Sequence, residues 1–364
     1  MRKLATIREI KELLPIPGAD LIELALIDGW QVVVKKGEFN TKDSCVYIEI
    51  DSILPPVDPF KFMEARKYRV RTIKLRGCLS QGLALPLSYF PSMKNTPKIG
   101  EDVTELLGIT KYDPEDHGNN SVKLPVHPAV LLLCKFKLGR WIYYKFKPKS
   151  KGTWPEWVPK TDEERVQNIR GLFGLISQRN LYATEKLDGQ SFTAFYKGNE
   201  RTGLFKRGVY GVCSRNVWFK NPNETKNTWC NTALEHDIRV ILNAFWNAHK
   251  VSLAIQGEIV GPTIQGNKYK LNKNSLYVYN IYDITNAKYF THLQKAAFTK
   301  QYNLKLTPTV ELQYEGKYPV NFVIQADGQS VLHTCPREGI VVRDIMDDSF
   351  SFKAISNAFL LKEK

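Results

Sequence analysis

The segment from Ala183 to Ser191 constrains the fold of this chain most, because it places Lys186, Asp188 and Gly189 within four residues. In an extended segment side chains alternate between two faces, so the lysine and the aspartate are expected to point the same way. The glycine then permits a turn or a close approach of the backbone to a ligand. A cation and an anion on one face suit an amine that attacks a phosphorus atom near a metal ion. The alternative is a surface strand that ends in a turn and carries a Lys–Asp ion pair.

The composition favours a protein of two domains that binds a polyanion. The 364 residues are enough for two domains, and the hydrophobic content of 43% can build real cores. The net charge of +15 favours a phosphate-rich partner, because basic side chains gain by releasing counterions from phosphates. The alternative is a basic protein without such a partner.

The cysteine, histidine and hydropathy patterns argue against several other classes. The six cysteines show no C-x-x-C spacing and the six histidines show no metal spacing, which argues against a zinc site and for reduced thiols inside a cell. No apolar run approaches the ~18 residues of a membrane span. The segment from Met1 to Leu4 lacks the apolar core of a signal peptide. We therefore expect a soluble, intracellular protein with no membrane contact.

Residues 1–107 carry the pattern of short strands joined by tight turns. Asp28-Gly29 is a hairpin signal between strand candidates at 22–27 and 30–34. A series of short strands predicts a small closed barrel, and an OB-type barrel suits a basic protein. A further candidate strand at 68–74 has one charged face, which we expect to grip nucleic acid through three basic residues, Arg69, Arg71 and Lys74.

A polar region separates this barrel from the rest of the chain. Residues 108–128 are rich in proline, glycine and asparagine and are interpreted as a linker. The following segment, from Lys135 to Lys151, mixes basic and aromatic residues without an acidic one, as a nucleic-acid groove does. The alternative is an ordinary pair of solvated strands.

Two capping boxes predict helices in the second half of the chain. Thr161 to Glu164 predicts a helix that carries Arg165 in its early turns. Thr232 to Glu235 predicts a second helix start. Apolar residues then recur at helical spacing, as expected for an amphipathic helix that buries them in a core; they are Leu234, Ile238, Ile241, Leu242 and Phe245.

Several later strand candidates carry charged or aromatic side chains where a plain core strand would not. Glu258 lies within an apolar strand, and Tyr277 and Tyr279 share a face of the next strand candidate. Glu338 opens a further apolar strand, and Lys353 lies within the last one. Taken with Lys186, these residues suggest a site assembled from many strands.

The order of these segments resembles the motif series of the covalent nucleotidyltransferases, the superfamily of polynucleotide ligases and mRNA capping enzymes. The matching segments, in chain order, are Lys186-Leu187-Asp188-Gly189, Ser214-Arg215-Asn216, Gly257-Glu258-Ile259, Tyr277 to Asp283, Glu338-Gly339-Ile340-Val341 and Lys353-Ala354-Ile355-Ser356.

Within that superfamily the whole chain is similar to the Deinococcus/Naegleria-type nick-sealing RNA ligases. It departs from DNA ligases and capping enzymes at Ser191, where those enzymes usually have arginine, and no room for a C-terminal OB domain follows Lys353. The resemblance implies an α+β fold, with an N-terminal OB-type β-barrel followed by an antiparallel-sheet nucleotidyltransferase (ATP-grasp-like ligase) domain. The expected boundaries are 1–110 for an OB-fold RNA-binding module, 111–128 for a linker and 129–364 for the adenylyltransferase domain.

The resemblance also implies an ATP-dependent RNA ligase that seals 3′-OH/5′-phosphate nicks in duplex RNA through a lysyl-AMP intermediate and an RNA-adenylate. Lys186 is then the nucleophile, and Asp188, Glu258 and Glu338 hold Mg²⁺ or Mn²⁺, with Glu258 and Glu338 counted among the catalytic residues. Lys353 contacts the α-phosphate. The remaining residues expected to bind the nucleotide are Glu185, Arg165, Arg215, Asn216 and Tyr279, with Tyr277 as the alternative stacking residue.

Other functions are compatible with the same motifs. A DNA ligase or a capping-type nucleotidyltransferase is one alternative, and a non-catalytic nucleic-acid-binding protein that kept the fold is another. The choice of ATP or GTP as substrate distinguishes an RNA ligase from the first alternative. Covalent labelling by the nucleotide distinguishes it from the second. A monomer that binds nicked duplex RNA is the expected working form.

Overall fold

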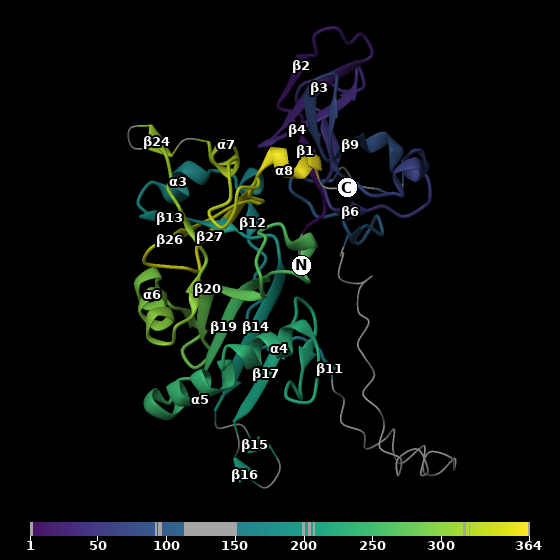
Figure 1. Ribbon diagram of the computed structural model, residues 1–364. Helices are drawn as coiled ribbons and strands as arrows, with labels where there is room; N and C mark the ends of the chain where they lie inside the picture. The colour runs from purple at the N-terminus through teal and green to yellow at the C-terminus, as the bar shows by residue number, and fades with distance from the viewer. Residues whose placement is uncertain are drawn as a thin grey trace, which may run out of the picture.

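The computed structural model describes residues 3–91, 93, 97–112, 151–198, 201–202, 205–206, 208–315, 318–319 and 321–362. These residues form an N-terminal module, which ends at Tyr112, and a larger C-terminal part (Figure 1). Most of the predicted linker at 111–128 and of the basic, aromatic segment that starts at Lys135 lies outside the described residues, so both stay predictions.

The N-terminal module is built from short antiparallel strands, as the sequence predicts. Asp28, with φ of 53°, turns the β3–β4 hairpin at the predicted place. The paired strands are β1 (Ala5–Glu9), β5 (Ser44–Ile48) and β9 (Leu83–Pro86); β2 (Glu12–Pro15), β3 (Ile22–Ile27) and β4 (Trp30–Lys35); β7 (Thr72–Leu75) and β8 (Cys78–Gln81); and β6 (Ser52–Ile53) and β10 (Thr110–Lys111). Short 3-10 turns, η1 (Lys61–Arg66) and η2 (Leu87–Tyr89), connect them.

The prediction of a charged strand at 68–74 is wrong for the first part of this segment, which includes Arg69. The strand β7 begins only at Thr72, and Arg69 is 5% exposed and faces Asp51, while Arg71 and Lys74 are exposed. Tyr68 has a left-handed backbone, with φ of 58°, so the extended segment begins after it, and Arg69 is turned inward by its ion pair with Asp51. Arg69 is therefore not part of an exposed basic face.

Two mainly antiparallel sheets dominate the C-terminal part. One has the order β11-β18-β17-β14-β19-β20-β21, with β22 also paired to β20, and the other has the order β12-β27-β26-β13-β23. The first contains β11 (Lys151–Gly152), β18 (Trp218–Phe219), β17 (Val209–Cys213), β14 (Gln190–Lys197), β19 (Leu253–Val260), β20 (Ser275–Asp283), β21 (Lys288–Tyr289) and β22 (Lys305–Leu306). The second contains β12 (Glu164–Arg165), β27 (Ser351–Ile355), β26 (Gly339–Asp344), β13 (Leu181–Lys186) and β23 (Thr309–Val310). Short hairpins are formed by β15 (Arg201–Thr202) with β16 (Phe205–Lys206) and by β24 (Tyr314–Glu315) with β25 (Tyr318–Pro319).

Helices cover the outer faces of these sheets. The helices α4 (Thr228–Glu235) and α5 (Ile238–His249) pack on the first sheet (Figure 1), where Phe192 and Ala194 of β14 are fully buried beneath them. The others are α3 (Leu172–Ile176), α6 (His292–Gln301), α7 (Phe322–Ala326) and α8 (Asn357–Lys362), with 3-10 turns η4 (Val166–Asn168) and η5 (Gln265–Asn267). Among the described residues, no helix has the length and hydropathy needed to cross a bilayer.

Neither of the two predicted capping boxes starts a helix. Thr161 to Glu164 starts no helix, because its side chains serve tertiary partners: Thr161 is bonded to Tyr279, and Asp162 is paired with Lys353. Arg165 consequently lies in β12, parallel to β27. Thr232 lies inside α4, whose cap is Asn227, and Glu235 ends that helix. The amphipathic stripe on α5 is confirmed at Ile238, Ile241, Leu242 and Phe245, whereas Leu234 belongs to α4 and is exposed.

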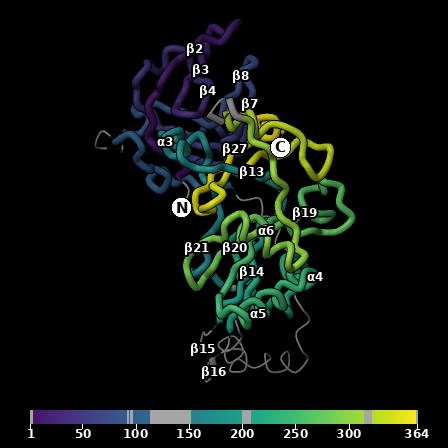
Figure 2. Tube along the Cα trace, turned by 90° about the vertical axis from the view of Figure 1, so that its left-hand side faces the viewer, coloured from purple at the N-terminus to yellow at the C-terminus, as the bar shows by residue number. Residues whose placement is uncertain are grey.

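The N-terminal module packs against the C-terminal part through η4 and α8. Asn168 is the centre of this interface: its amide group is bonded to Trp30 at 2.8 Å, to Glu49 at 2.6 Å and to Arg8 at 3.2 Å. Ile50 of the module packs with Ile355 and Leu360. Figure 2 shows the C-terminal end of the chain beside β7. The two parts therefore meet through apolar packing and several hydrogen bonds.

Candidate active site

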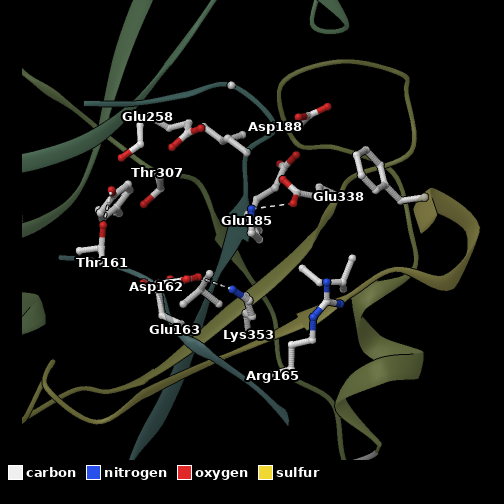
Figure 3. Close-up of a pocket in the computed structure, with 18 of the residues that line it drawn as sticks. Thr161, Asp162, Glu163, Arg165, Glu185, Asp188, Glu258, Thr307, Glu338 and Lys353 are labelled. Atoms are coloured by element: carbon white, nitrogen blue, oxygen red, sulfur yellow. Dashed lines mark hydrogen bonds and ion pairs between the residues drawn. The ribbon is translucent and has the colours of Figure 1, made fainter. Parts of the chain in front are cut away.

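A cavity of about 460 Å³ opens where the two sheets and the N-terminal module meet. Figure 3 shows that acidic and basic side chains from several elements point into it. Of the residues that the sequence assigned to the nucleotide, the metal ion or catalysis, those lining it are Arg165, Glu185, Lys186, Asp188, Arg215, Glu258, Tyr279, Glu338 and Lys353. Residues far apart in the chain thus meet in one place.

Lys186 is the last residue of β13 and lies in the cavity with Asp188, as strand alternation predicts. Its Nζ atom is 2.6 Å from Oε1 of Glu338, which directly precedes β26. Gly189 is required by packing, because a Cβ atom there would lie 2.2 Å from the carbonyl oxygen of Ile259. The K-x-D-G segment therefore combines a side-chain pair in the cavity with a close backbone contact to β19.

The charges that act on Lys186 come mainly from carboxylates. Burial alone would lower the pKa of Lys186, but the carboxylates of Glu338, Glu258 and Asp188 outweigh it and raise this pKa well above its ordinary value. Burial also raises the pKa of Glu338, an effect that Lys186 opposes. In this arrangement Lys186 is a protonated ammonium, and neutralising the carboxylates would favour the free amine.

The three expected metal-binding carboxylates line the same cavity. In the part of the chain that the structure describes, no group of three or more His, Cys, Asp or Glu side chains is arranged to hold a metal ion by itself. Asp188 forms an ion pair with Lys268, and Glu338 forms one with Lys186. Carboxylate oxygens are nevertheless the donors that Mg²⁺ takes, and Mg²⁺ commonly keeps several waters between itself and a protein. The donor set fits a hydrated divalent cation.

Lys353 lies on the opposite side of the cavity floor from Glu338 and is 9% exposed. Its Nζ atom is 2.9 Å from Asp162, whose other oxygen is 3.0 Å from Nζ of Lys111. Burial would raise the pKa of Asp162, but the ammonium groups of Lys353 and Lys111 hold it far below its usual range. Arg215 lies 3.7 Å from the same carboxylate. Asp162 therefore holds several cations at this end of the cavity.

Arg165 lies next to Lys353, because β12 pairs in parallel with β27 and these two residues are direct partners in the ladder. Its guanidinium group is 5% exposed and is 3.2 Å from Asp51 of the N-terminal module. Asp51 also contacts Arg69 at 3.2 Å. The N-terminal module thus contributes directly to the wall of the cavity.

Tyr279, not Tyr277, presents its ring to the cavity. Its hydroxyl is 2.9 Å from that of Thr161, and its carbonyl accepts a hydrogen bond of 2.7 Å from Lys295. Tyr277 packs instead in a small cluster with Leu187, Val260 and Tyr269.

Glu185 and Asn216, which were also expected to bind the nucleotide, are placed differently from the residues described above. Glu185 reaches the cavity but is 1% exposed and accepts a hydrogen bond from the backbone of Val331, and its burial raises its pKa. Asn216 is a described residue outside the cavity lining, where it accepts a hydrogen bond from Lys160.

Sequence reasoning missed several charged residues of the site, among them Asp162, Lys268 and Asp51. Asp162 was hidden inside an apparent capping box, although an acidic run just before the expected phosphate-binding arginine was a usable signal. Lys268 and Asp51 follow no recognisable motif, and only the tertiary structure brings them to Asp188 and Arg165.

The fold and the site together define a nucleotidyltransferase-type ligase. Residues 179–355 match the family model described as RNA ligase, and residues 4–87 match one described as an OB-fold domain. The predicted fold class, an N-terminal OB-type module ahead of an antiparallel-sheet domain, is thereby confirmed.

Solved structures extend this match to the whole chain. A mutant of Naegleria gruberi RNA ligase with ATP and Mn is 35% identical over 100% of this chain and 99% of that chain, with a TM-score of 0.79. Structures of the same ligase with PPi, and of a mutant with AMP and Mn, match at 35% identity over the same shares, with a TM-score of 0.78. A search of curated proteins gave no match. The chain belongs to the RNA ligase family.

Proposed function

We propose that this protein is an ATP-dependent RNA ligase that seals 3′-OH/5′-phosphate nicks in duplex RNA. The observation that carries the proposal is the position of Lys186 at the end of β13, with carboxylates on one side and the Lys353–Arg165 pair across the cavity. An amine between groups that can bind a metal ion and groups that can bind phosphates suits phosphoryl transfer, which needs positioning and charge neutralisation above all.

The reaction takes three steps, each a displacement at phosphorus. Nζ of Lys186, as the free amine, attacks the α-phosphorus of ATP and gives up a proton, the bond to the bridging oxygen breaks, and pyrophosphate leaves. The AMP group then passes from the lysine to the 5′-phosphate of the RNA, which restores the amine. Finally the 3′-OH attacks the 5′-phosphorus, loses its proton and releases AMP.

The other residues of the site support these steps. Lys353 contacts the α-phosphate, and Arg165 contacts the phosphates that leave. The ring of Tyr279 stacks on adenine, and Arg215, Asn216 and Glu185 complete the nucleotide site. ATP and a divalent cation, Mg²⁺ or Mn²⁺, serve the enzyme, and Asp188, Glu258 and Glu338 hold the cation, which neutralises charge on the phosphates and on these carboxylates.

The two parts of the chain have different roles in the proposed reaction. We assign residues 1–110 to RNA binding and residues 129–364 to adenylyl transfer, with the linker at 111–128 between them. The high net charge supports an RNA partner, and a monomer carries the complete site.

The test is incubation of the full-length protein with ATP labelled at the α-phosphate and Mg²⁺, followed by denaturing electrophoresis. We expect a labelled protein band that is absent in Lys186→Ala, because the proposal makes Nζ of Lys186 the nucleophile. The labelled protein should then join a nicked RNA duplex in the absence of free ATP.

Matched reactions separate the alternatives. Labelling by GTP in place of ATP would indicate a capping-type enzyme, and sealing of nicked DNA in preference to RNA would indicate a DNA ligase. A Lys186→Ala variant that still becomes labelled would contradict the assigned nucleophile, and an unlabelled wild-type protein would indicate a non-catalytic binding protein.

A further inference from the structure

The strand β20 carries a bulge at Tyr279. The register with β19 shifts between Gln256 and Gly257. Their partners in β20 are Asn280 and Val278, so Tyr279 is the extra residue of the bulge. A bulged residue is left out of the ladder, and the bulge turns its side chain in a new direction. The carbonyl of Tyr279 therefore needs a hydrogen-bond partner outside the β19–β20 ladder.

The partner of this carbonyl is the ammonium group of Lys295 in α6. Its Nζ atom donates a hydrogen bond of 2.7 Å to the carbonyl of Tyr279 and one of 3.0 Å to the hydroxyl of Tyr182. Lys295 also forms an ion pair with Asp348, and the two side chains are 3% and 1% exposed. The hydroxyl of Tyr182 donates a hydrogen bond of 2.7 Å to Asp348 in turn. Buried polar groups that satisfy one another in this way form a rigid network.

This network joins the two sheets that form the cavity. Tyr279 belongs to β20 of the first sheet, whereas Tyr182 belongs to β13 of the second sheet. Asp348 lies in the turn between β26 and β27, and Figure 1 shows α6 beside β20. Lys186 is the last residue of β13. One ammonium group is therefore bonded both to the strand of the proposed nucleophile and to the strand of the expected stacking ring.

Close packing does not hold Tyr279 from behind. A second cavity, of about 310 Å³, lies on that side and is lined by Tyr182, His292 and Lys295 among others. Tyr279 lines both cavities, whereas Lys295 lies outside the lining of the main one. Dense packing normally fixes a core residue, so hydrogen bonds have to fix the bulged strand here. Lys295 consequently acts on the main cavity through Tyr279.

We propose that Lys295 is a positioning residue for the nucleotide, which holds the bulge of β20 so that the ring of Tyr279 meets the base at a fixed place relative to Lys186. This inference rests on the proposed function. A base held in a fixed place relative to β13 keeps the α-phosphorus in line with the amine, and a small misplacement slows such a reaction strongly. Without the ammonium group the buried carbonyl of Tyr279 has lost its donor, and the bulged strand shifts toward the second cavity.

Ligands with and without a base test this role. We would titrate the full-length protein with AMP, ATP and pyrophosphate in Mg²⁺ buffer by calorimetry. Lys295→Met should weaken binding of AMP and ATP on the order of 10-fold, because a misplaced ring loses part of its stacking with the base. Pyrophosphate carries no base, so its affinity should stay unchanged. An equal loss of pyrophosphate affinity would overturn the inference, because Lys295 would then act through the whole fold.

A double variant separates positioning from stability. Lys295→Met leaves the carboxylate of Asp348 buried without its partner, and adding Asp348→Asn removes that charge. The double variant should therefore be more stable in urea than Lys295→Met. It should still bind AMP on the order of 10-fold more weakly than the wild type, because the carbonyl of Tyr279 still lacks its donor. A double variant with wild-type affinity for AMP would show that Lys295 contributes only to stability, and the inference would fail.

Tyr182→Phe tests the connection to β13. It removes the hydroxyl and keeps the ring, and Lys295 keeps its hydrogen bond to the carbonyl of Tyr279. The affinity for AMP should therefore match that of the wild type. Single-turnover labelling at saturating α-labelled ATP should slow several-fold, because the base and the nucleophile are no longer joined through one ammonium group. An unchanged labelling rate would refute this connection.

The control is Lys300→Met, which removes an exposed lysine of the same helix outside both cavities. It should bind all three ligands as the wild type does. A loss of AMP affinity equal to that of Lys295→Met would contradict the inference, because the charge of α6 would then matter and not its position. Failure of the proposed function is distinguishable, since the wild-type protein would then not become labelled by ATP, whatever its affinity for AMP.

Discussion

The carboxylates near Lys186 are the residues whose charge matters most for its chemistry. Glu338 forms an ion pair with Lys186, and Glu258 and Asp188 act on it electrostatically from the same cavity. As long as these charges are not neutralised, they keep the lysine protonated, and a protonated amine is no nucleophile. If these carboxylates hold the cation, as we propose, the same residues both keep the amine protonated and release it when the cation binds.

Alanine at Asp188, Glu258 or Glu338 should lower the rate of self-adenylylation at least ~100-fold, about the cost of removing one charge-stabilising group from a preorganised site. The measurement is single-turnover labelling with α-labelled ATP and Mg²⁺. Glu311→Ala, which removes an exposed carboxylate outside the cavity, is the control. Wild-type rates in all three variants would show that the carboxylates are structural.

The ring of Tyr279 should decide how well ATP binds. Tyr279→Ala should raise the KM for ATP on the order of 10-fold, because stacking of a base on an aromatic ring contributes about 1–3 kcal/mol. Tyr279→Phe keeps the ring and loses the hydrogen bonds of the hydroxyl with Thr161 and Ser191, so it should stay close to the wild type. Equal effects of the two substitutions would assign the role to the hydroxyl instead of the ring.

At the scale of elements, the sequence predicted best where local pattern and tertiary contacts agree. The helix α5 follows its apolar spacing because the stripe faces the core beneath it. The segment from Thr161 to Arg165 has the local pattern of a helix start, yet its polar side chains bond to Tyr279 and Lys353, more than 100 residues away. A prediction from the local sequence could not include these distant partners. Asp162 was missed as a site residue for the same reason.

One helix is held to the sheet by a buried charge. Lys295 of α6 is 3% exposed and donates hydrogen bonds to the carbonyl of Tyr279 and to the hydroxyl of Tyr182, and it forms an ion pair with the buried Asp348. This contact lies directly behind the residue that we expect to stack on adenine.

Lys295→Met should lower the free energy of unfolding by about 3–5 kcal/mol, because it leaves the carboxylate of Asp348 buried without its ammonium partner. Urea unfolding measures this change. Lys300→Met, on the exposed side of the same helix, should change it by less than about 0.5 kcal/mol. A double variant that also carries Asp348→Asn should recover part of the loss; if it recovers none, the cost does not come from the unpaired carboxylate.

At the scale of the whole molecule, the order of the two parts was predictable and their docking was not. Strand patterns and turn signals locate the N-terminal module, but the contacts of Asn168 with Trp30 and Glu49 join residues that are more than 100 positions apart. The position of Arg69 in the cavity wall depends on this docking, which explains why the sequence placed it on an outer basic face.

At Gly29 the backbones of the two parts approach each other closely. A Cβ atom there would lie 2.8 Å from Cα of Gln167, so Gly29→Ala should push the module away from η4 at a cost of about 1–3 kcal/mol. We expect a lower midpoint in thermal unfolding and faster proteolysis between the parts. Gly174→Ala, where a Cβ atom meets nothing within 4 Å, is the control. Equal unfolding midpoints for both variants would contradict a tight interface.

The pairing of β12 with β27 fixes the distance between the backbones of Arg165 and Lys353, whatever the length of the chain between these two residues. Arg165 and Lys353 are partners in neighbouring strands, which lie ~4.8 Å apart in any sheet. The chain between them can lengthen or shorten at its loops without altering the separation of the two cations. Insertions in the intervening loops, or a chain whose ends are joined and reopened in one of them, should therefore keep Arg165 and Lys353 side by side.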